Sequence, residues 1–196
     1  MEKKNKKILI FSGIAVFALV LLDQFTKYLA VTFLKGKAAI PIIKDVFELK
    51  YLENTSAAFG MDPISLLHNV FHFDIFQENP QLYLNVRMGF FYILTIAMIC
   101  LFGWIFYKIP NKKRFLFLDL ILIFITAGAI GNLIDRMSQQ FVVDFLYFKL
   151  IDFPIFNVAD IYVTCASIAL VIVGIFYYKD EDIEMIFPSK KDKEKA

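Results

Sequence analysis

The stretch FNVADIYVTCASIALVIVGIFYY, residues 156–178, decides the fold class of this chain. Beyond Asp160 it runs for 18 residues, 161–178, without a charge. At about 1.5 Å per residue, a helix over 157–178 can cross a hydrocarbon core of about 30 Å. An ionised carboxylate within such a span costs roughly 2.5–3.5 kcal/mol, so intramembrane ionisable groups are functional by default. The stretch therefore predicts a membrane helix that carries Asp160 for a functional reason.

The surplus of apolar residues makes the chain an integral membrane protein. Of its 196 residues 59% are hydrophobic, whereas a soluble domain has about 45–50%. Four apolar blocks predict spans over about 8–34, 87–107, 115–134 and 157–178. Cys100 and Cys165 lie inside two of these blocks, with neither disulfide nor metal-ligand spacing. No charge pattern indicates a nucleic-acid-binding face, so we expect no nucleic-acid partner.

The first block has an alternative interpretation. MEKKNKK followed by ILIFSGIAVFALVLL, residues 1–22, resembles the n-region and h-region of a secretory signal peptide. No small-residue cleavage site follows closely, and DQFTKYLAVTFL continues the helical pattern to about Leu34. We therefore expect a retained first span and a membrane domain over residues 8–178.

The distribution of Lys and Arg predicts the orientation of the spans. Basic residues gather before span one, between spans two and three, and after span four: Lys3, Lys4, Lys6 and Lys7; Lys108, Lys112, Lys113 and Arg114; and Lys179, Lys190, Lys191, Lys193 and Lys195. The loop between spans three and four has only Arg136 and Lys149. The positive-inside rule then places both tails, 1–7 and 179–196, in the cytoplasm. We expect the second tail to be largely disordered.

The outer loop, residues 35–86, carries a strand signal. Phe47, Leu49 and Tyr51 alternate along the chain with a period of two, which predicts a small antiparallel sheet on the outer membrane surface. Residues 61–85 mix aromatic and polar side chains and predict a short interfacial helix or flap. The expected fold is thus an all-α membrane protein with four transmembrane helices and a small extracytoplasmic sheet.

Polar side chains from three spans and one loop are predicted to meet at one depth. With 1.5 Å of rise per residue, the end of span one, the end of span three and the start of span four all lie near the outer face. FVVDF, a short strand or helix, lies between the last two spans. The residues concerned are Asp23, Lys27, Asn132, Asp135, Arg136, Asp144, Asn157 and Asp160.

Each of these residues also has a purely structural interpretation. Asp23 and Lys27 are spaced as an i, i+4 ion pair, and Arg136 could anchor span three at the interface. Asn157 could cap span four, with Asp160 favoured by the helix dipole. Taken together the structural interpretation is weaker, because Asp144 and Asp160 flank one site and neither has an obvious exclusive cation.

Two carboxylates in an apolar setting are typical of amide hydrolysis. Held close, they cannot both ionise cheaply, so they share a proton. One then takes a proton from the attacking water, and the other donates a hydrogen bond to the developing oxyanion.

Other chemistries fit less well. No Ser or Cys nucleophile stands beside a His, and HxxxH at His68 and His72 lacks the Glu of a zinc-protease motif. We therefore expect no metal and no cofactor. Asp119 is predicted to be an interfacial residue near the cytoplasmic end of span three, far from the cluster.

Five segments resemble, in order and spacing, the boxes of the bacterial lipoprotein signal peptidase family, signal peptidase II. They are DQFTK (23–27), ENTSAAFG (53–60), GAIGNLIDR (128–136), FVVDF (141–145) and FNVAD (156–160). The resemblance covers about residues 8–178. It implies four transmembrane helices, a periplasmic β-cradle and an inner-membrane aspartyl endopeptidase that removes signal peptides before a diacylglyceryl-modified cysteine.

The resemblance also implies roles for individual residues. Asp144 and Asp160 would be the catalytic pair, and Asp135 a structural partner. The polar shell that positions substrate and pair would comprise Asp23, Lys27, Asn54, Asn132, Arg136 and Asn157. Partners would be prolipoproteins and membrane lipids, and we expect a monomer.

Two other classes of function remain possible from the residues. An ion- or proton-coupled transporter would use the same charges as a relay, but it requires a polar path across the whole bilayer. The inner halves of spans two and four offer almost no polar side chains. A membrane scaffold would need no paired free carboxylates at all.

Overall fold

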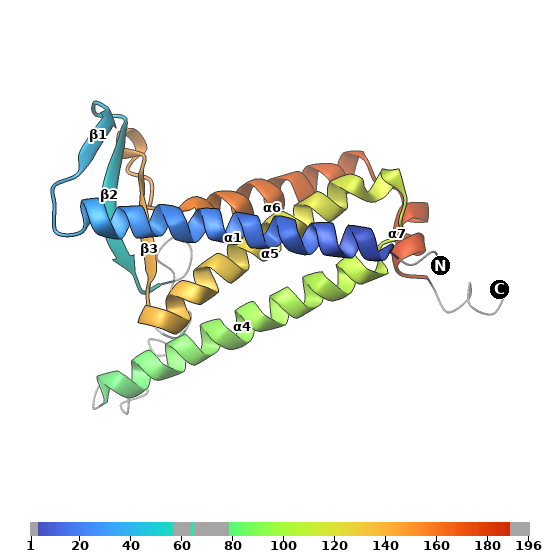
Figure 1. Ribbon diagram of the computed structural model, residues 1–196, viewed down its shortest axis with the longest axis horizontal. Coiled ribbons are helices and arrows are strands. Elements are labelled where there is room, and N and C mark those ends of the chain that lie inside the picture. Colours follow the sequence, from blue (N-terminus) through green and yellow to red (C-terminus); the bar gives the residue numbers. More distant parts are fainter. Residues whose placement is uncertain (1–3, 57–63, 65–78, 189–196) are drawn as a thin grey trace.

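Four long helices and a small sheet make up the computed structural model, which describes residues 4–56, 64 and 79–188. The helices are α1 (Lys6–Leu34), α4 (Pro80–Lys108), α5 (Leu116–Gln139) and α6 (Val158–Phe176). All four are long and apolar enough to cross a membrane. The start of α1 and the end of α6 lie at one end of the bundle and the sheet lies at the other (Figure 1). The predicted four-span architecture is confirmed.

Two helices extend beyond their predicted spans. Helix α4 begins at Pro80 rather than 87, because Asn79 caps it by accepting a hydrogen bond from the Leu82 N–H at 3.0 Å and proline suits a first helical position. Helix α5 continues to Gln139 rather than 134, and Gln140, with a φ of 64°, is its C-cap. Of the predicted flap 61–85, Asn79 caps α4 and residues 80–85 belong to it, and the rest lies outside the described residues except Ile64.

The predicted sheet is antiparallel and three-stranded, in the order β1 (Ile40–Ile43), β2 (Phe47–Asn54), β3 (Val142–Tyr147). FVVDF therefore contributes a strand rather than a helix. The half-buried side chains of Leu49 and Tyr51 pack with Val143 and Phe145 against the C-terminal end of α1. The register sets Asp144 opposite Leu52 and Val142 opposite Asn54. This pairing brings the end of the outer loop to the start of β3.

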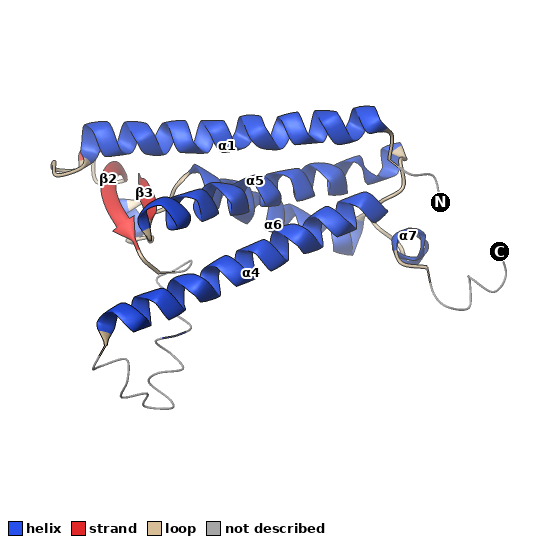
Figure 2. Ribbon diagram, turned by 60° about the horizontal axis from the view of Figure 1, so that its bottom comes forward, coloured by secondary structure: helices blue, strands red, loops and turns tan. Residues whose placement is uncertain are grey.

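Close approach of three helices depends on two glycines of α5. A Cβ on Gly128 would lie 2.5 Å from the carbonyl oxygen of Ala159, and one on Gly131 would run into the carboxylate of Asp23. The sequence GAIGN thus lets α6 and α1 approach the same stretch of α5. Helix α4 diverges from the other three toward the sheet end (Figures 1 and 2).

The other end of the bundle differs from the prediction in two respects. The tail after Tyr178 is not disordered throughout: α7 (Asp180–Ile186) is held by Arg114, which forms an ion pair with Asp182, while Ile186 packs in a buried cluster. Its four acidic residues suggested a solvated tail, but one of them, Asp182, accepts from the Lys179 N–H at the start of the helix and pairs with Arg114. Residues 189–196 lie outside the described part of the chain.

Asp119 is likewise more than an interfacial residue. Its carboxylate forms an ion pair with Lys4, whose side chain is buried and lies over the ring of Phe106 at 3.7 Å. The N-terminal segment is thereby tied to α4 and α5, far from the polar cluster.

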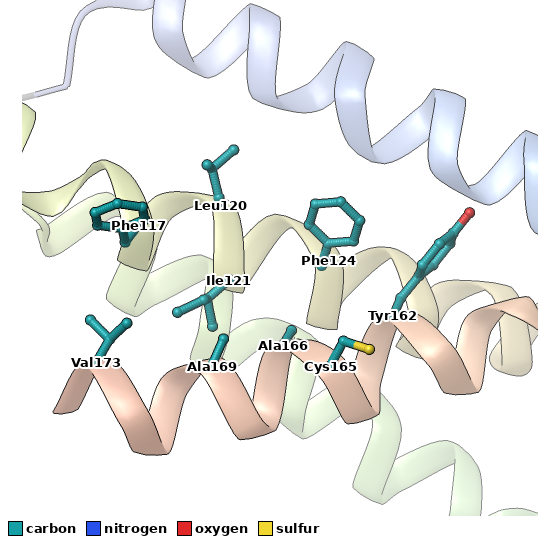
Figure 3. Close-up of a pocket in the computed structure, with 9 residues that line it drawn as sticks. All are labelled: Phe117, Leu120, Ile121, Phe124, Tyr162, Cys165, Ala166, Ala169 and Val173. Atoms are coloured by element: carbon teal, nitrogen blue, oxygen red, sulfur yellow. The ribbon is translucent and has the colours of Figure 1, made fainter. Parts of the chain in front are cut away.

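An apolar cavity of about 280 Å³ lies between α5 and α6 on the side that faces α1 (Figure 3). Phe124 of α5 and Tyr162 and Ala169 of α6 are among its lining residues. Ala169 follows Asp160 by nine residues, which is about two and a half helical turns. The cavity therefore opens on the opposite face of α6 from Asp160.

Candidate active site

Asp144 and Asp160 meet around a shared asparagine. The Asn157 side-chain amide donates to Asp144 Oδ1 at 2.6 Å, and the Asn157 backbone N–H donates to Asp160 Oδ2 at 3.1 Å. Asp144 is buried, with 1% of its surface exposed, whereas Asp160 is half-buried. One carboxylate is therefore enclosed, and the other stays partly accessible beside it.

The position of Asp160 follows from the start of α6. The Asn157 side chain caps the helix by accepting a hydrogen bond from the Asp160 N–H at 3.0 Å. In turn, the Asp160 carboxylate accepts a hydrogen bond from the Asn157 N–H. This reciprocal capping box fixes the Asp160 side chain. Its second oxygen accepts a hydrogen bond from the Asn132 amide at 2.8 Å. The cap that the structural interpretation predicted is thus present and also orients the carboxylate.

The position of Asp144 follows from the sheet register. Asn54, at the end of β2, donates from its side-chain amide to Asp144 Oδ2 at 2.8 Å. The Asn54 side-chain oxygen accepts from the Ser56 N–H at 2.9 Å, and the Ser56 carbonyl accepts from Arg136 at 3.2 Å. Asn54 therefore points into the cluster and contacts one of the paired aspartates directly.

The surroundings of Asp144 favour its protonated form. Burial first, and the nearby carboxylate of Asp160 second, raise the pKa of the Asp144 carboxyl to about 7. The hydrogen bonds from Asn54 and Asn157 oppose this rise without cancelling it. Within the described residues no Lys or Arg forms an ion pair with either Asp144 or Asp160. The pair can therefore hold one proton near neutral pH.

A second layer of charge lies behind the two aspartates and is centred on Lys27. Its ammonium is 2.9 Å from Asp23 Oδ2 and 3.1 Å from Asp135 Oδ2, and it donates to the Asn132 side-chain oxygen at 2.9 Å. All three charged side chains are almost fully buried, with Asp23 0% and Lys27 3% exposed. The i, i+4 pair within α1 thus extends into a cross-helix network.

Both carboxylates of this layer hold backbone next to the paired aspartates. Asp23 Oδ1 accepts from the N–H of Ala159 at 2.9 Å, and Asp135 Oδ2 accepts from the N–H of Val143 at 3.0 Å. Ala159 precedes Asp160, and Val143 precedes Asp144. The network therefore fixes the backbone at both aspartates.

Arg136 lies at the edge of the cluster. It donates to the Ser56 carbonyl, and its guanidinium lies over the ring of Phe91 at 4.9 Å. Its Nε is buried and has no hydrogen-bond partner among the described residues. The carbonyl of Arg136 accepts from the Tyr92 hydroxyl at 2.7 Å, so α4 also supports this corner.

The structure brings together every residue that the sequence placed at the site: Asp23, Lys27, Asn54, Asn132, Asp135, Arg136, Asp144, Asn157 and Asp160. His68 and His72 lie outside the described residues. In the described part of the chain, no group of three or more His, Cys, Asp or Glu side chains could hold a metal ion.

Sequence reasoning missed Gln24, Phe91 and Tyr92. Gln24 donates to Asp135 at 2.9 Å and also reaches Asp23 and the carbonyl of Gly131. Its place next to Asp23 in DQFTK was a usable signal. Phe91 and Tyr92 sit in an apolar block, where nothing distinguished them from residues that face lipid.

Comparisons with known proteins agree on one family. The sequence profile of a family described as "Signal peptidase (SPase) II" matches residues 15–176. The lipoprotein signal peptidase of Clostridium tetani is 37% identical over 168 residues, which cover 84% of this chain and 90% of that protein. The lipoprotein signal peptidase of Bacillus velezensis is 33% identical, covering 92% of this chain and 96% of that protein.

Solved structures show the same fold. A bacterial membrane enzyme determined by the in meso method at 2.3 Å resolution superposes with a TM-score of 0.67 at 26% identity and covers 97% of both chains. A second such structure, at 1.9 Å resolution, also gives a TM-score of 0.67, at 28% identity, and covers 91% of this chain and 99% of that one.

Proposed function

This chain belongs to the signal peptidase II family, and we propose that Asp144 and Asp160 are its catalytic pair. It is an aspartic endopeptidase that processes prolipoproteins. The single observation that carries this proposal is that Asn157 donates a hydrogen bond to each of the two carboxylates. Among the described residues, no cation forms an ion pair with either of them. A transporter or a scaffold no longer needs to be invoked for these charges.

The two carboxylates have different roles because their surroundings differ. Asp144 is enclosed and holds the shared proton near neutral pH, which its raised pKa of about 7 supports. Asp160 is the more accessible carboxylate and takes a proton from the water that attacks the scissile carbonyl. Asp144 then donates a hydrogen bond to the oxyanion of the tetrahedral intermediate. When that intermediate collapses, the leaving amine takes up a proton from the pair.

The remaining polar residues divide into two groups. Asp23 and Lys27 are too deeply buried to touch substrate as the structure stands, so we assign them to positioning the pair, together with Asn132. Arg136 and Asn54 lie at the accessible edge and bind the substrate backbone. The unpartnered Nε of Arg136 supports this role, because a buried donor without a partner is costly and a substrate carbonyl would satisfy it.

The substrate is a prolipoprotein with a diacylglyceryl-modified cysteine, and cleavage occurs immediately before that cysteine. The protein works as a monomer in the bacterial inner membrane with both termini in the cytoplasm and the pair near the outer face. The Lys and Arg asymmetry supports this orientation, and the position of α7 and the start of α1 at the end of the bundle opposite the sheet supports placing both tails on one side.

The test is cleavage of a synthetic diacylated prolipoprotein peptide by purified protein in detergent, with the cut site read by mass spectrometry. Asp144→Asn and Asp160→Asn should each lose cleavage while melting as cooperatively as the unsubstituted protein. Asp45→Asn is the matched control, because Asp45 is exposed at a φ of 59°, a conformation that Asn also tolerates. Cleavage by either folded aspartate variant would refute the assignment.

A further inference from the structure

Gln24 makes an unusual set of contacts for an uncharged side chain in a membrane helix. Its amide nitrogen lies 2.9 Å from Asp135 Oδ1, 3.1 Å from the Gly131 carbonyl oxygen and 3.2 Å from Asp23 Oδ2. One amide therefore joins two buried carboxylates that belong to different helices, α1 and α5.

We propose that Gln24 is a positioning residue for the cleavage reaction, acting through Asp23 and Asp135 on the backbone that carries the catalytic pair. The proposal rests on the proposed function of Asp144 and Asp160. Gln24 itself touches neither carboxylate of that pair in any hydrogen bond of the described residues.

The charges of the second layer, Asp23, Lys27 and Asp135, explain why a neutral donor is needed. When ionised, Asp23 and Asp135 can only accept hydrogen bonds, and Lys27 supplies one positive charge for the two. Like charges in a low-dielectric setting repel strongly, so the carboxylates stay together only if further donors reach both. Gln24 reaches both without adding a charge. Among the described residues it is the one hydrogen-bond donor to Asp135 Oδ1, since Val143 and Lys27 both contact Oδ2.

Displacement of either carboxylate would move the backbone next to one of the catalytic residues. Asp135 holds the N–H of Val143, and Asp23 holds the N–H of Ala159. Each of those residues is bonded directly to one catalytic aspartate. A shift of about 1 Å at reacting groups can cost about a hundredfold in rate.

The first variant removes the donor and keeps the length of the side chain. In Gln24→Met, kcat should fall about tenfold to a hundredfold while KM stays within about twofold, because the substrate contacts are untouched. The control is Thr32→Val on the same helix, whose hydroxyl donates only to the Tyr28 carbonyl at 2.8 Å. That variant should keep the kcat of the unsubstituted protein. Rates are expressed per folded molecule, with melting temperature recorded in parallel.

The second variant provides a readout that simple loss of packing would not change. In Gln24→Glu, a protonated carboxyl can donate to Asp135, whereas an ionised one adds a third negative charge. The groups that face it are Asp23 and Lys27 of α1, Asp135 of α5 and, through Asp23, Tyr162 of α6. The ratio of its kcat to that of the unsubstituted protein should therefore rise as the pH falls.

Three outcomes decide the proposal. A kcat for Gln24→Met equal to that of the unsubstituted protein would overturn it. So would a Gln24→Glu ratio that does not change with pH, which also keeps the proposal falsifiable if Gln24→Met does not fold. If Asp144→Asn or Asp160→Asn cleaves substrate, the proposed function itself fails, and that result is distinct from either outcome at Gln24.

Discussion

At the scale of single residues, side-chain amides rather than cations contact the two carboxylates that we propose as the catalytic pair. Asn54 and Asn157 donate to Asp144, and Asn132 donates to Asp160. A neutral donor orients a carboxylate but lowers its proton affinity less than a full positive charge would. The positive charge of Lys27 is instead paired with Asp23 and Asp135, one layer behind. This separation keeps the pair able to hold and release a proton.

Replacement of Asn54 by alanine tests the amide that comes from the sheet. Asn54→Ala removes the donor to Asp144 and the acceptor for the Ser56 N–H, so turnover should fall about tenfold or more. The melting temperature should change little, because Asn54 sits at the end of a strand and is only half-buried. Initial rates on the diacylated peptide give the answer. Unchanged turnover would reduce Asn54 to a turn residue.

The pH dependence of stability tests the proton on Asp144. Its native pKa of about 7 lies above the ordinary value of 3.8, so between these values the native state binds a proton that the unfolded chain has released. The unsubstituted protein should therefore lose stability as pH rises from about 4 to about 7, and level off above that. Asp144→Asn should lack this dependence, so its stability advantage should grow over the same interval. Thermal melts in detergent across that interval measure it, and parallel curves would contradict the raised pKa.

The charged residues of the site and three asparagines, Asn54, Asn132 and Asn157, could be predicted from the sequence and its family resemblance, whereas Gln24 and the aromatic residues of α4 could not. A carboxylate at membrane depth has a large desolvation cost, so Asp144 and Asp160 stand out without a structure. Gln24 costs less to bury and gave no such signal. The contact of Tyr92 with the Arg136 carbonyl depends on how α4 approaches α5, which no local pattern encodes.

At the scale of elements, the junction of α1, α5 and α6 depends on backbone approach. Gly128 and Gly131 occupy two positions where a side chain would meet the Ala159 carbonyl or the Asp23 carboxylate. Small residues at such crossings are the usual means of close packing between membrane helices. The same approach allows Asp23 to reach the N–H of Ala159.

Alanine substitution of two glycines separates packing from helix propensity. Gly131→Ala should displace the Asp23 carboxylate, lower the melting temperature and reduce cleavage, with a cost of about 1–3 kcal/mol as in other overpacked sites. Gly13→Ala is the matched control on α1, because nothing lies within 4 Å of its added Cβ. It should leave cleavage unchanged and raise the melting temperature slightly, because alanine favours a helix more than glycine does. Equal behaviour of the two variants would show that the crossing is not tight.

Hydropathy predicted which elements exist but not where they end. The start of α4 at Pro80 depends on a cap by Asn79, and α5 continues through NLIDR because those polar groups find partners on α1 and α6. Helix α7 was missed because four of its seven residues are acidic, which reads as a solvated tail until Arg114 is seen to pair with Asp182. Each difference between the predicted and the observed helices therefore depends on side-chain contacts that hydropathy does not encode.

At the scale of the whole molecule, the two ends of the bundle have different characters. One end carries the sheet and the polar cluster, and the other carries the start of α1, the Lys4–Asp119 ion pair and α7. The sequence predicted that both termini lie on one side, because four spans return the chain to its starting side. Which membrane face that side meets is the part of the account that rests on Lys and Arg counts alone.

Reporter fusions test that orientation. A reporter active only outside the cytoplasm should work when fused near Asn79, at the start of α4, and fail when fused near Lys112, at its other end. A fusion near residue 191 should also fail. Activity at Lys112 would invert the topology and place the proposed catalytic pair on the cytoplasmic side.

The measurement that tests the central claim most directly compares Asp144→Asn, Asp160→Asn and the double variant in one cleavage assay. If the two carboxylates work as one unit, each single variant should fall to the same residual rate, and the double variant should be no slower. All three should remain folded, because Asn is nearly isosteric with Asp and adds no charge to the apolar site. A folded single variant with substantial cleavage, or a double variant much slower than both singles, would contradict the account.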